Sequence, residues 1–202
     1  MSNIGVLIEM DGQEIKTSNY GVLTAACEGG NAVALVFTDN GEEIKSDLMR
    51  FGAGKIVTMS AESPVQKAKL MAAAVKEFNL GALLGLSSAC GRDLLARCAC
   101  ILDAPLALDA MQVNLSEGTV VKSHFSGKTT ATIKLTGGTL LIGLRPNVIE
   151  AVENPVSGEL ISFAAEAGIS DGFKVLEIKK GGAGSIDLTE AEIIITGGRP
   201  MN

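Results

Sequence analysis

Aromatic residues are scarce in this sequence: they make up 3% of its 202 residues, with no tryptophan and one tyrosine, Tyr20. The volume of the core must therefore come from Leu, Ile, Val, Ala and Met. Hydrophobic residues nevertheless reach 47% and charged residues 20%, which is typical of a globular protein with a well-filled interior. Such a core suits parallel strands, because strands buried on both faces appear in a sequence as short continuous aliphatic runs.

Long apolar runs and an excess of positive charge are also missing. No run approaches the roughly twenty apolar residues that a membrane-spanning helix needs, so we predict no membrane insertion. The opening residues Met1–Ile4 lack the basic and then apolar pattern of a secretory signal, and we predict a cytoplasmic protein. The formal net charge is −6, which argues against nucleic acid, because binding along a phosphate backbone needs a concentrated basic surface. A single nucleotide is not excluded, since a few backbone N–H groups can hold one.

Histidine and paired cysteines, the usual ligands of a structural metal, are sparse. His124 is the only histidine, and no Gly-x-Ser-x-Gly motif accompanies it to suggest a hydrolase. The cysteines lack zinc-ligand spacing, and they are Cys27, Cys90, Cys98 and Cys100. We predict reduced, metal-free thiols that behave as small buried hydrophobic residues.

The first half of the sequence alternates short aliphatic runs with amphipathic stretches. The runs predict strands at Ile4–Ile8, Ala32–Phe37, Lys55–Met59 and Gly81–Leu86. The stretches between and after them predict helices at Asn19–Glu28, Glu42–Arg50, Pro64–Phe78 and Gly91–Leu102. Ser63 and Pro64 mark the third helix start most clearly, as an N-cap and a first-turn proline. This alternation predicts an α/β three-layer sandwich, in which helices flank both faces of a mostly parallel sheet.

The second half of the sequence changes character. Four strand-like runs follow one another with only glycine-containing turns between them, which predicts an appended, antiparallel β-meander: Ala110–Leu115, Thr119–Phe125, Thr129–Leu135 and Leu140–Leu144. After it the pattern is weak, with a short helix near Leu160–Ala167 and two last strands at Phe173–Ile178 and Glu192–Thr196. The final strand runs into Gly197-Gly198, which suggests a connection to a further domain.

Two glycine-containing segments invite a nucleotide-binding interpretation. Ser126–Thr130 resembles the end of a P-loop, but the pattern needs a glycine where this chain has Lys122, and the segment joins two strands. A surface hairpin is the better interpretation. Ser87–Arg97 instead runs from the carboxyl end of a strand into a helix, where open α/β sheets bind ligands. The same small residues also allow close strand–helix packing, and the residues alone do not decide between a nucleotide site and a packed or subunit-facing turn.

Several motifs resemble those of electron-transfer flavoprotein alpha subunits. Ala89-Cys90-Gly91-Arg92-Asp93-Leu94-Leu95-Ala96-Arg97 is similar to the family pattern small-x-Gly-Lys/Arg-Asp/Asn-Leu-Leu-Pro-Arg. Four further matches follow in order: Leu102–Leu106, Ala131–Lys134, Leu144–Asn147, and the pair Asp187–Ala191 with Ile195–Arg199. Together they extend over essentially the whole chain.

This resemblance implies more than the residues show by themselves. The fold would be of the adenine nucleotide alpha hydrolase-like type, with residues 1–196 as an amino-terminal α/β domain and residues 197–202 as a hinge to a carboxy-terminal FAD-binding domain. FAD would lie mainly on that further domain, and the hinge arginine, Arg199, would contact it. We therefore expect no stoichiometric FAD on these 202 residues alone.

The resemblance also implies an electron carrier rather than an enzyme. The partner would be the electron-transfer flavoprotein beta subunit, for which this domain forms the assembly platform in a heterodimer. Electrons would come from acyl-CoA or other flavin dehydrogenases and pass to a quinone reductase or another acceptor. Ala96 and Pro200 depart from the family pattern, and the fixed φ of Pro200 alters the exit of the chain after Arg199.

Two other functions fit the residues. One is a stand-alone nucleotide-binding domain of the universal-stress or alpha-hydrolase type, which would use the turn Ser87–Gly91. The other is an assembly module without any ligand. Nucleotide binding by the isolated domain would favour the first of these.

Overall fold

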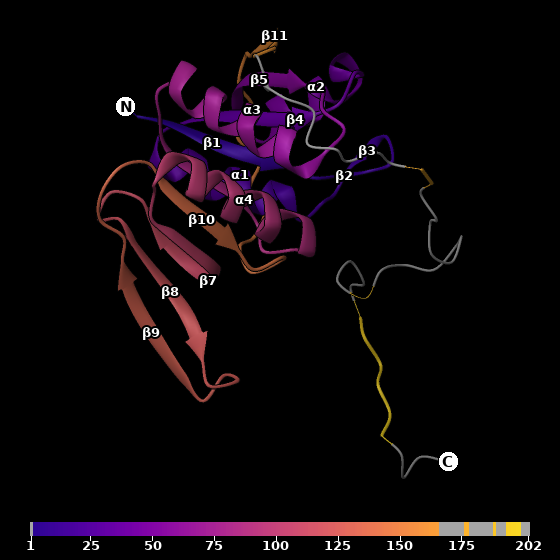
Figure 1. The fold of residues 1–202 in the computed structure, drawn as a ribbon. Coiled ribbons are helices and arrows are strands. Elements are labelled where there is room, and N and C mark those ends of the chain that lie inside the picture. Colours follow the sequence, from indigo (N-terminus) through magenta and orange to yellow (C-terminus); the bar gives the residue numbers. More distant parts are fainter. Residues whose placement is uncertain (1, 166–175, 178–187, 189–192, 199–202) are drawn as a thin grey trace.

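A nine-stranded, mostly parallel sheet organises the part of the chain that the structure describes (Figure 1). The structure is a computed structural model, and it describes residues 2–165, 176–177, 188 and 193–198. The strand order across the sheet is β11-β5-β4-β1-β6-β10-β7-β8-β9. Seven neighbouring strands run parallel: β11 (Glu159–Ser162), β5 (Ala53–Met59), β4 (Asn31–Phe37), β1 (Asn3–Ile8), β6 (Leu80–Leu86), β10 (Leu140–Leu144) and β7 (Leu106–Asn114). β8 (Thr119–His124) and β9 (Thr129–Lys134) continue the sheet in antiparallel fashion.

Helices cover both faces of this sheet, as the alternating pattern predicted. α1 (Asn19–Gly29) and α2 (Gly41–Arg50) pack on one face, and α3 (Pro64–Glu77) and α4 (Ala89–Leu102) pack on the other. Each face has its own aliphatic core, with Leu23 and Leu48 in one and Met71 and Leu95 in the other, all fully buried. The predicted three-layer α/β sandwich is therefore confirmed. No described helix is long and apolar enough to cross a membrane.

Local sequence signals explain why the helices on one face begin where they do. At α3 the hydroxyl of Ser63 accepts a hydrogen bond from the backbone N–H of Gln66, and the Gln66 side chain accepts one from the Ser63 N–H. This capping box satisfies two backbone donors at the helix start. At α4 the hydroxyl of Ser88 accepts from the N–H of Gly91 at 2.9 Å. A short two-stranded ribbon, β2 (Met10–Asp11) and β3 (Glu14–Ile15), lies between β1 and α1.

The predicted four-run meander is correct for three of its runs and wrong for Leu140–Leu144. β7, β8 and β9 form the antiparallel part, whereas Leu140–Leu144, as β10, lies between β6 and β7 and is parallel to both. Its Leu141 and Ile142 are fully buried and its Leu144 is almost so. A continuous aliphatic strand is more stable inside a covered parallel sheet than at an edge, because both of its faces can be buried there.

The weak signal after Arg145 was also misassigned in part. The helix predicted near Leu160–Ala167 is wrong for its first residues, because Glu159–Ser162 form β11 and pair in parallel with β5. Most of the strand predicted at Phe173–Ile178 lies outside the described residues. Of the strand predicted at Glu192–Thr196, residues 193–196 are described, and they are exposed and form no strand. Ile193, Ile194 and Ile195 are 80%, 51% and 94% exposed.

Candidate functional site

The sheet reverses its direction of winding between β1 and β6. From β1 the chain moves outward through β4 to β5, and it then crosses to the opposite side of β1 to form β6. Ligands of open α/β sheets bind outside the carboxyl ends of the strands at such a switch point, because the two adjoining loops diverge there. In this chain those ends carry Glu9, directly after β1, and Ser87-Ser88, directly after β6.

Glu9 places a carboxylate inside this switch point. Its side chain is only 7% exposed. The hydroxyl of Ser88 donates a hydrogen bond to Glu9 Oε1, and Lys16 Nζ lies 4.0 Å from Glu9 Oε2. A buried carboxylate is stable only when it is hydrogen-bonded and paired, and these two neighbours supply both conditions.

Asn19 holds the backbone of Glu9 in place from the first residue of α1. The Asn19 side chain is fully buried. Its Oδ1 accepts from the Glu9 N–H at 3.1 Å, and its Nδ2 donates to the carbonyl oxygens of Glu9 and Lys16, each at 2.8 Å. The Asn19 side-chain amide therefore satisfies both backbone polar groups of Glu9, as a neighbouring strand would do inside the sheet.

The first turn of α4 packs very closely against the end of β6 and the Glu9 carboxylate. An ideal Cβ built on Gly91 would lie 2.0 Å from the carbonyl oxygen of Leu86 and 2.8 Å from Glu9 Oε1. Only glycine allows the first turn of α4 to approach the end of β6 and the Glu9 carboxylate so closely. Beside this contact lies a small cavity of about 240 Å³, lined by Leu7, Ile8, Glu9, Met10, Lys16, Phe37, Lys67, Cys90 and Leu94.

A second polar cluster joins Arg145, directly after β10, to Asp109 within β7. Arg145 forms a bidentate ion pair with Asp109, with Nε–Oδ1 and Nη2–Oδ2 distances of 3.0 and 2.8 Å. The hydrogen bonds from Arg145 lower the pKa of the Asp109 carboxyl below its usual value. Asp109 has a positive φ of 61°, and its N–H donates to the hydroxyl of Ser87 at 2.7 Å. This cluster links β7, at Asp109, to the loop after β6.

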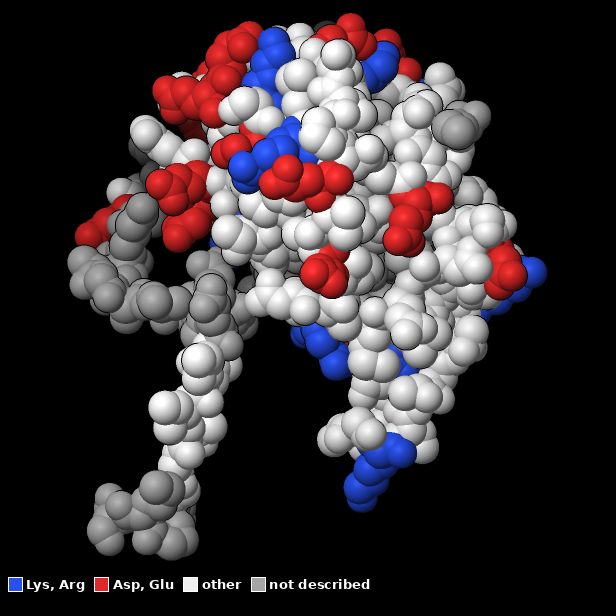
Figure 2. All heavy atoms as spheres, turned by 180° about the vertical axis from the view of Figure 1, so that it is seen from behind, with Lys and Arg blue, Asp and Glu red and all other residues white. Residues whose placement is uncertain are grey.

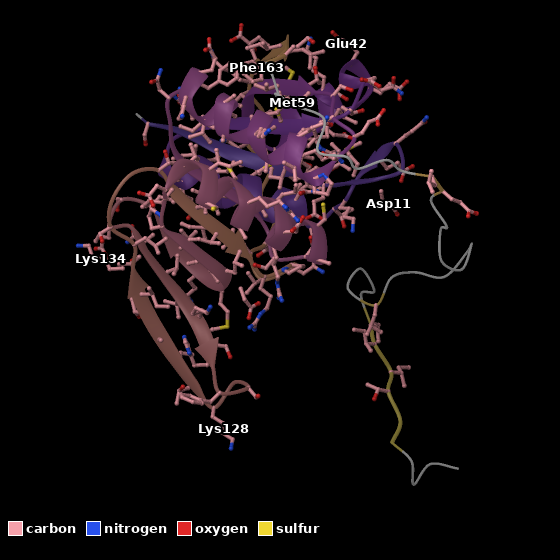
Figure 3. The ribbon with its side chains drawn as sticks, in the orientation of Figure 1. Asp11, Glu42, Met59, Lys128, Lys134 and Phe163 are labelled. Carbon is pink, nitrogen blue, oxygen red and sulfur yellow. The ribbon has the colours of Figure 1, made fainter. Side chains whose placement is uncertain are left out.

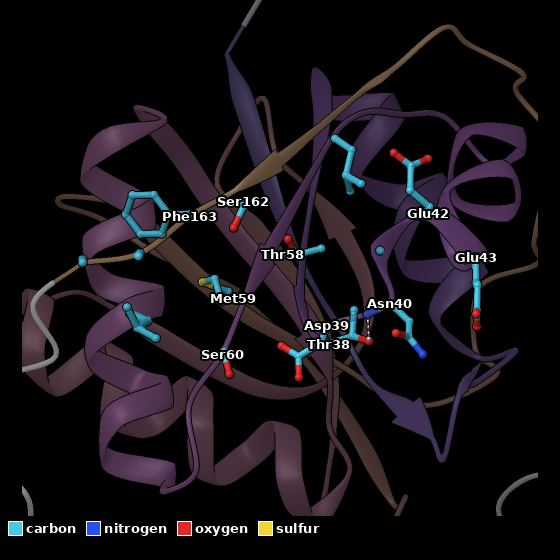
Figure 4. A pocket seen from close by; sticks show the side chains of 15 residues that line it. Thr38, Asp39, Asn40, Glu42, Glu43, Thr58, Met59, Ser60, Ser162 and Phe163 are labelled. Atoms are coloured by element: carbon cyan, nitrogen blue, oxygen red, sulfur yellow. Dashed lines mark hydrogen bonds between the residues drawn. The ribbon is translucent and has the colours of Figure 1, made fainter.

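A wider hollow of about 590 Å³ lies at the carboxyl ends of β4, β5 and β11 (Figure 4). Asp39 and Ser60 lie at its lower side in this view, with Phe163 on the side of α3, and Asn40 donates its N–H to Thr38 Oγ1 at 3.1 Å. Its lining includes Asp39, Glu42 and Glu43 but no lysine or arginine. The described part of this hollow therefore offers no cation to a phosphate group.

The structure places most of the sequence-predicted residues. Ser87–Arg97 does lie at the switch point, and its Arg97 forms a solvent-exposed ion pair with Asp93 one helical turn earlier. Ser126–Thr130 forms a hairpin, as expected: Ser126–Lys128 lie in the turn, with Gly127 at φ 87°, and Thr129 and Thr130 begin β9. Arg199, the flavin contact that the resemblance implies, lies outside the described residues and stays a prediction.

Sequence reasoning missed Glu9, the most buried charged residue at the switch point. A signal was present, since a carboxylate directly follows the continuous aliphatic run of β1 and stands before any turn residue. Sequence reasoning also missed the Asp109–Arg145 pair, because 36 residues separate the two partners.

The cysteine prediction needs a correction. All four thiols are free, but Cys90 and Cys100 are exposed and Cys27 is half-buried, so only Cys98 is a buried core residue. Burial raises the pKa of the Cys98 thiol to about 12. Within the described residues no group of His, Cys, Asp or Glu is arranged to hold a metal ion.

Comparisons with known proteins identify the family. A family profile described as "Electron transfer flavoprotein domain" matches residues 4–168. The electron transfer flavoprotein subunit alpha of Bacillus subtilis (strain 168) is 29% identical over 84% of this chain and 55% of its own length. The subunit alpha of Syntrophomonas wolfei is 26% identical, with 98% of this chain and 66% of the relative covered.

A eukaryotic relative is similar over the same extent. The probable mitochondrial electron transfer flavoprotein subunit alpha of Caenorhabditis elegans is 25% identical over 97% of this chain and 61% of its own length. The chain thus spans between about half and two thirds of the length of the relatives it matches. Because the family profile matches well over half of the chain, and the fold agrees with the prediction, the chain belongs to the electron transfer flavoprotein domain family, as an amino-terminal domain of the alpha-subunit type.

Proposed function

We propose that this domain is the assembly platform of an electron-transfer flavoprotein, where it holds a beta-type subunit in an alpha/beta heterodimer. The complete protein would carry electrons from acyl-CoA or other flavin dehydrogenases to a quinone reductase or another acceptor in the cytoplasm, and the domain itself would catalyse no reaction. The family match and the alpha-subunit relatives support this proposal.

The described residues do not fit a flavin or another dinucleotide at the switch point. The pyrophosphate of such a cofactor would need the start of α4, where Glu9 already places a buried negative charge. FAD, which supplies the electron chemistry in this family, is therefore proposed to bind mainly to a further domain. We retain the proposed boundary, with residues 1–196 as the platform, residues 197–202 as the hinge, and Arg199 as a contact to that FAD.

The observation that carries the platform proposal is the projecting β8–β9 hairpin. β9 is the last strand of the sheet, so its outer edge has no strand partner among the described residues. Phe125 at its tip is 78% exposed. Residues 119–134 contain three lysines, Lys122, Lys128 and Lys134, and no aspartate or glutamate.

Charge sets this hairpin apart from the rest of the molecule. Figure 2 shows acidic side chains spread over the body, whereas the projecting arm ends in a basic one, and Figure 3 places Lys128 at the hairpin tip and Lys134 at its base. Lys134, on the edge strand β9, disfavours pairing of that strand with a second copy of itself. The three hairpin lysines favour an acidic partner instead, because complementary charges steer association and fix its register. The hairpin therefore suits a partner with an acidic surface, which we propose is the beta-type subunit.

Charge reversal on the hairpin tests this proposal. We expect Lys128→Glu/Lys134→Glu to raise the Kd for the beta-type subunit of the same genome by about tenfold or more, since like charges would then face each other. The matched control is Lys69→Glu/Lys76→Glu on α3, which makes the same change in net charge away from the hairpin and should leave the Kd within about twofold. Biolayer interferometry at two salt concentrations measures both. Equal effects of the two pairs would show that the hairpin is not the interface.

The stand-alone nucleotide-binding alternative remains a second candidate because Ser87–Arg97 does lie at the switch point. The buried Glu9 carboxylate is the specific observation against it, and its consequences can be tested directly.

A further inference from the structure

We propose that Glu9 serves as a built-in anion at the switch point, which closes this crevice to phosphate-bearing ligands. This inference deepens the proposed function, because it gives a physical reason why the domain acts as a platform and not as a nucleotide carrier. It rests on the contacts of Glu9 and does not depend on the identity of the partner subunit.

The start of α4 would otherwise attract an anion. The first N–H groups of a helix lack partners within the helix, and the helix dipole adds a partial positive charge there. The first turn of α4 contains no acidic residue of its own, whereas the first turn of α2 contains Glu42 and Glu43. The negative charge at α4 is therefore supplied from another element, by Glu9 at the end of β1.

Ser88 connects the carboxylate to the helix. Its hydroxyl accepts from the Gly91 N–H at 2.9 Å and donates to Glu9 Oε1. The Ser88 hydroxyl and the Gly91 N–H, two of the groups that an incoming phosphate would use, are thus already engaged. The acceptor of the Ser88 hydroxyl is the charged carboxylate of Glu9, and hydrogen bonds to charged acceptors are stronger than those between neutral groups.

The crevice also lacks room between the carboxylate and the helix. A single added carbon on Gly91 would lie 2.8 Å from Glu9 Oε1, so no phosphate group could pass between them. The carboxylate is positioned by Asn19, which fixes its backbone, and by Lys16, 4.0 Å from Oε2. Glu9 is therefore anchored from the backbone and from the side chain.

The surroundings of Glu9 become basic once its charge is removed. The cavity of about 240 Å³ next to it is lined by Lys16 and Lys67, and the Lys67 Nζ lies over the Phe37 ring, 5.3 Å from its centroid. Two lysines and the start of α4, at Cys90, would then face one small volume. Such a combination is a typical phosphate site.

The test compares Glu9→Gln with the wild-type chain, using inorganic phosphate and AMP as probes. Glutamine keeps the shape of the side chain and an acceptor for Ser88 but removes the charge. We expect Glu9→Gln to bind phosphate at least about tenfold more tightly than the wild type, with NMR shifts at Ser88 and Gly91, in titrations at constant ionic strength. Glu43→Gln is the matched control, because it removes one exposed carboxylate from the first turn of α2 and should leave binding unchanged.

Two results would overturn the proposal. One is equal phosphate affinity in Glu9→Gln, Glu43→Gln and the wild type. The other is saturable binding of AMP or phosphate to the wild-type chain with shifts at Ser88 and Gly91, and this measurement decides the matter even if Glu9→Gln does not fold. Because the readout uses the chain alone, failure here is distinct from failure to bind a beta-type subunit.

Discussion

Gly91→Ala is expected to destabilise the domain by about 3 kcal/mol, a large effect for one methyl group. The added Cβ would lie 2.0 Å from the carbonyl oxygen of Leu86 and 2.8 Å from Glu9 Oε1. Leu86 belongs to the buried strand β6, so its backbone cannot move aside as a flexible side chain would. Alanine gains up to about 1 kcal/mol over glycine in a helix interior, and the clash outweighs this gain. Urea unfolding followed by circular dichroism measures the difference.

Gly81→Ala is the matched control for this prediction. Gly81 is an exposed residue of β6, and its added Cβ would have no neighbour closer than 3.5 Å. We expect its free energy of unfolding to stay within about 0.5 kcal/mol of the wild type or to rise slightly. If Gly91→Ala were as mild as Gly81→Ala, the close approach of α4 to the end of β6 would be wrong, and with it the geometry of the switch point.

Asn19→Ala is expected to lower the free energy of unfolding by about 3 kcal/mol, the second large effect. The change removes three hydrogen bonds at once and leaves the Glu9 N–H without its acceptor in a buried site. Alanine is a better helix former than asparagine at the start of α1, but by less than about 0.7 kcal/mol. The loss of the buried hydrogen bonds should therefore outweigh the gain in helix propensity, and the net change should be destabilising.

Asn31→Ala controls for the general effect of removing an asparagine side chain. Asn31 is exposed, and its amide makes only a 3.5 Å contact with Asn3 Oδ1. We expect a change of less than about 0.5 kcal/mol in the same urea series. Comparable losses for both variants would mean that Asn19 does not hold the end of β1 as the structure indicates.

Elements with strong local signals could be predicted from the sequence. α3 is an example, because Ser63, Pro64 and Gln66 define its start through contacts within a few residues. The alternation of strands and helices likewise predicted the parallel sheet and its covering layers. The start of α3 depends on near neighbours, and the sheet type follows from the order of the elements along the chain, so a sequence records both directly.

Features that depend on distant partners could not be predicted in the same way. Leu140–Leu144 follows three antiparallel runs in sequence, yet it is inserted between β6 and β7, because only the complete sheet offers it a covered position. Glu9 is the corresponding case at the candidate site. Its hydroxyl donor, Ser88, is 79 residues away, so the carboxylate after β1 gives no local sign of its partner.

The most direct test of the platform account is native mass spectrometry of this chain co-expressed with the beta-type subunit of the same genome. We predict a one-to-one complex of the two polypeptides, and a pool of uncombined chain whose mass shows neither flavin nor AMP. The contrary result would be a chain that stays alone in the presence of the subunit and carries one nucleotide per polypeptide. That outcome would contradict both the pairing role and the closure of the switch point by Glu9, and it would favour a stand-alone nucleotide-binding domain.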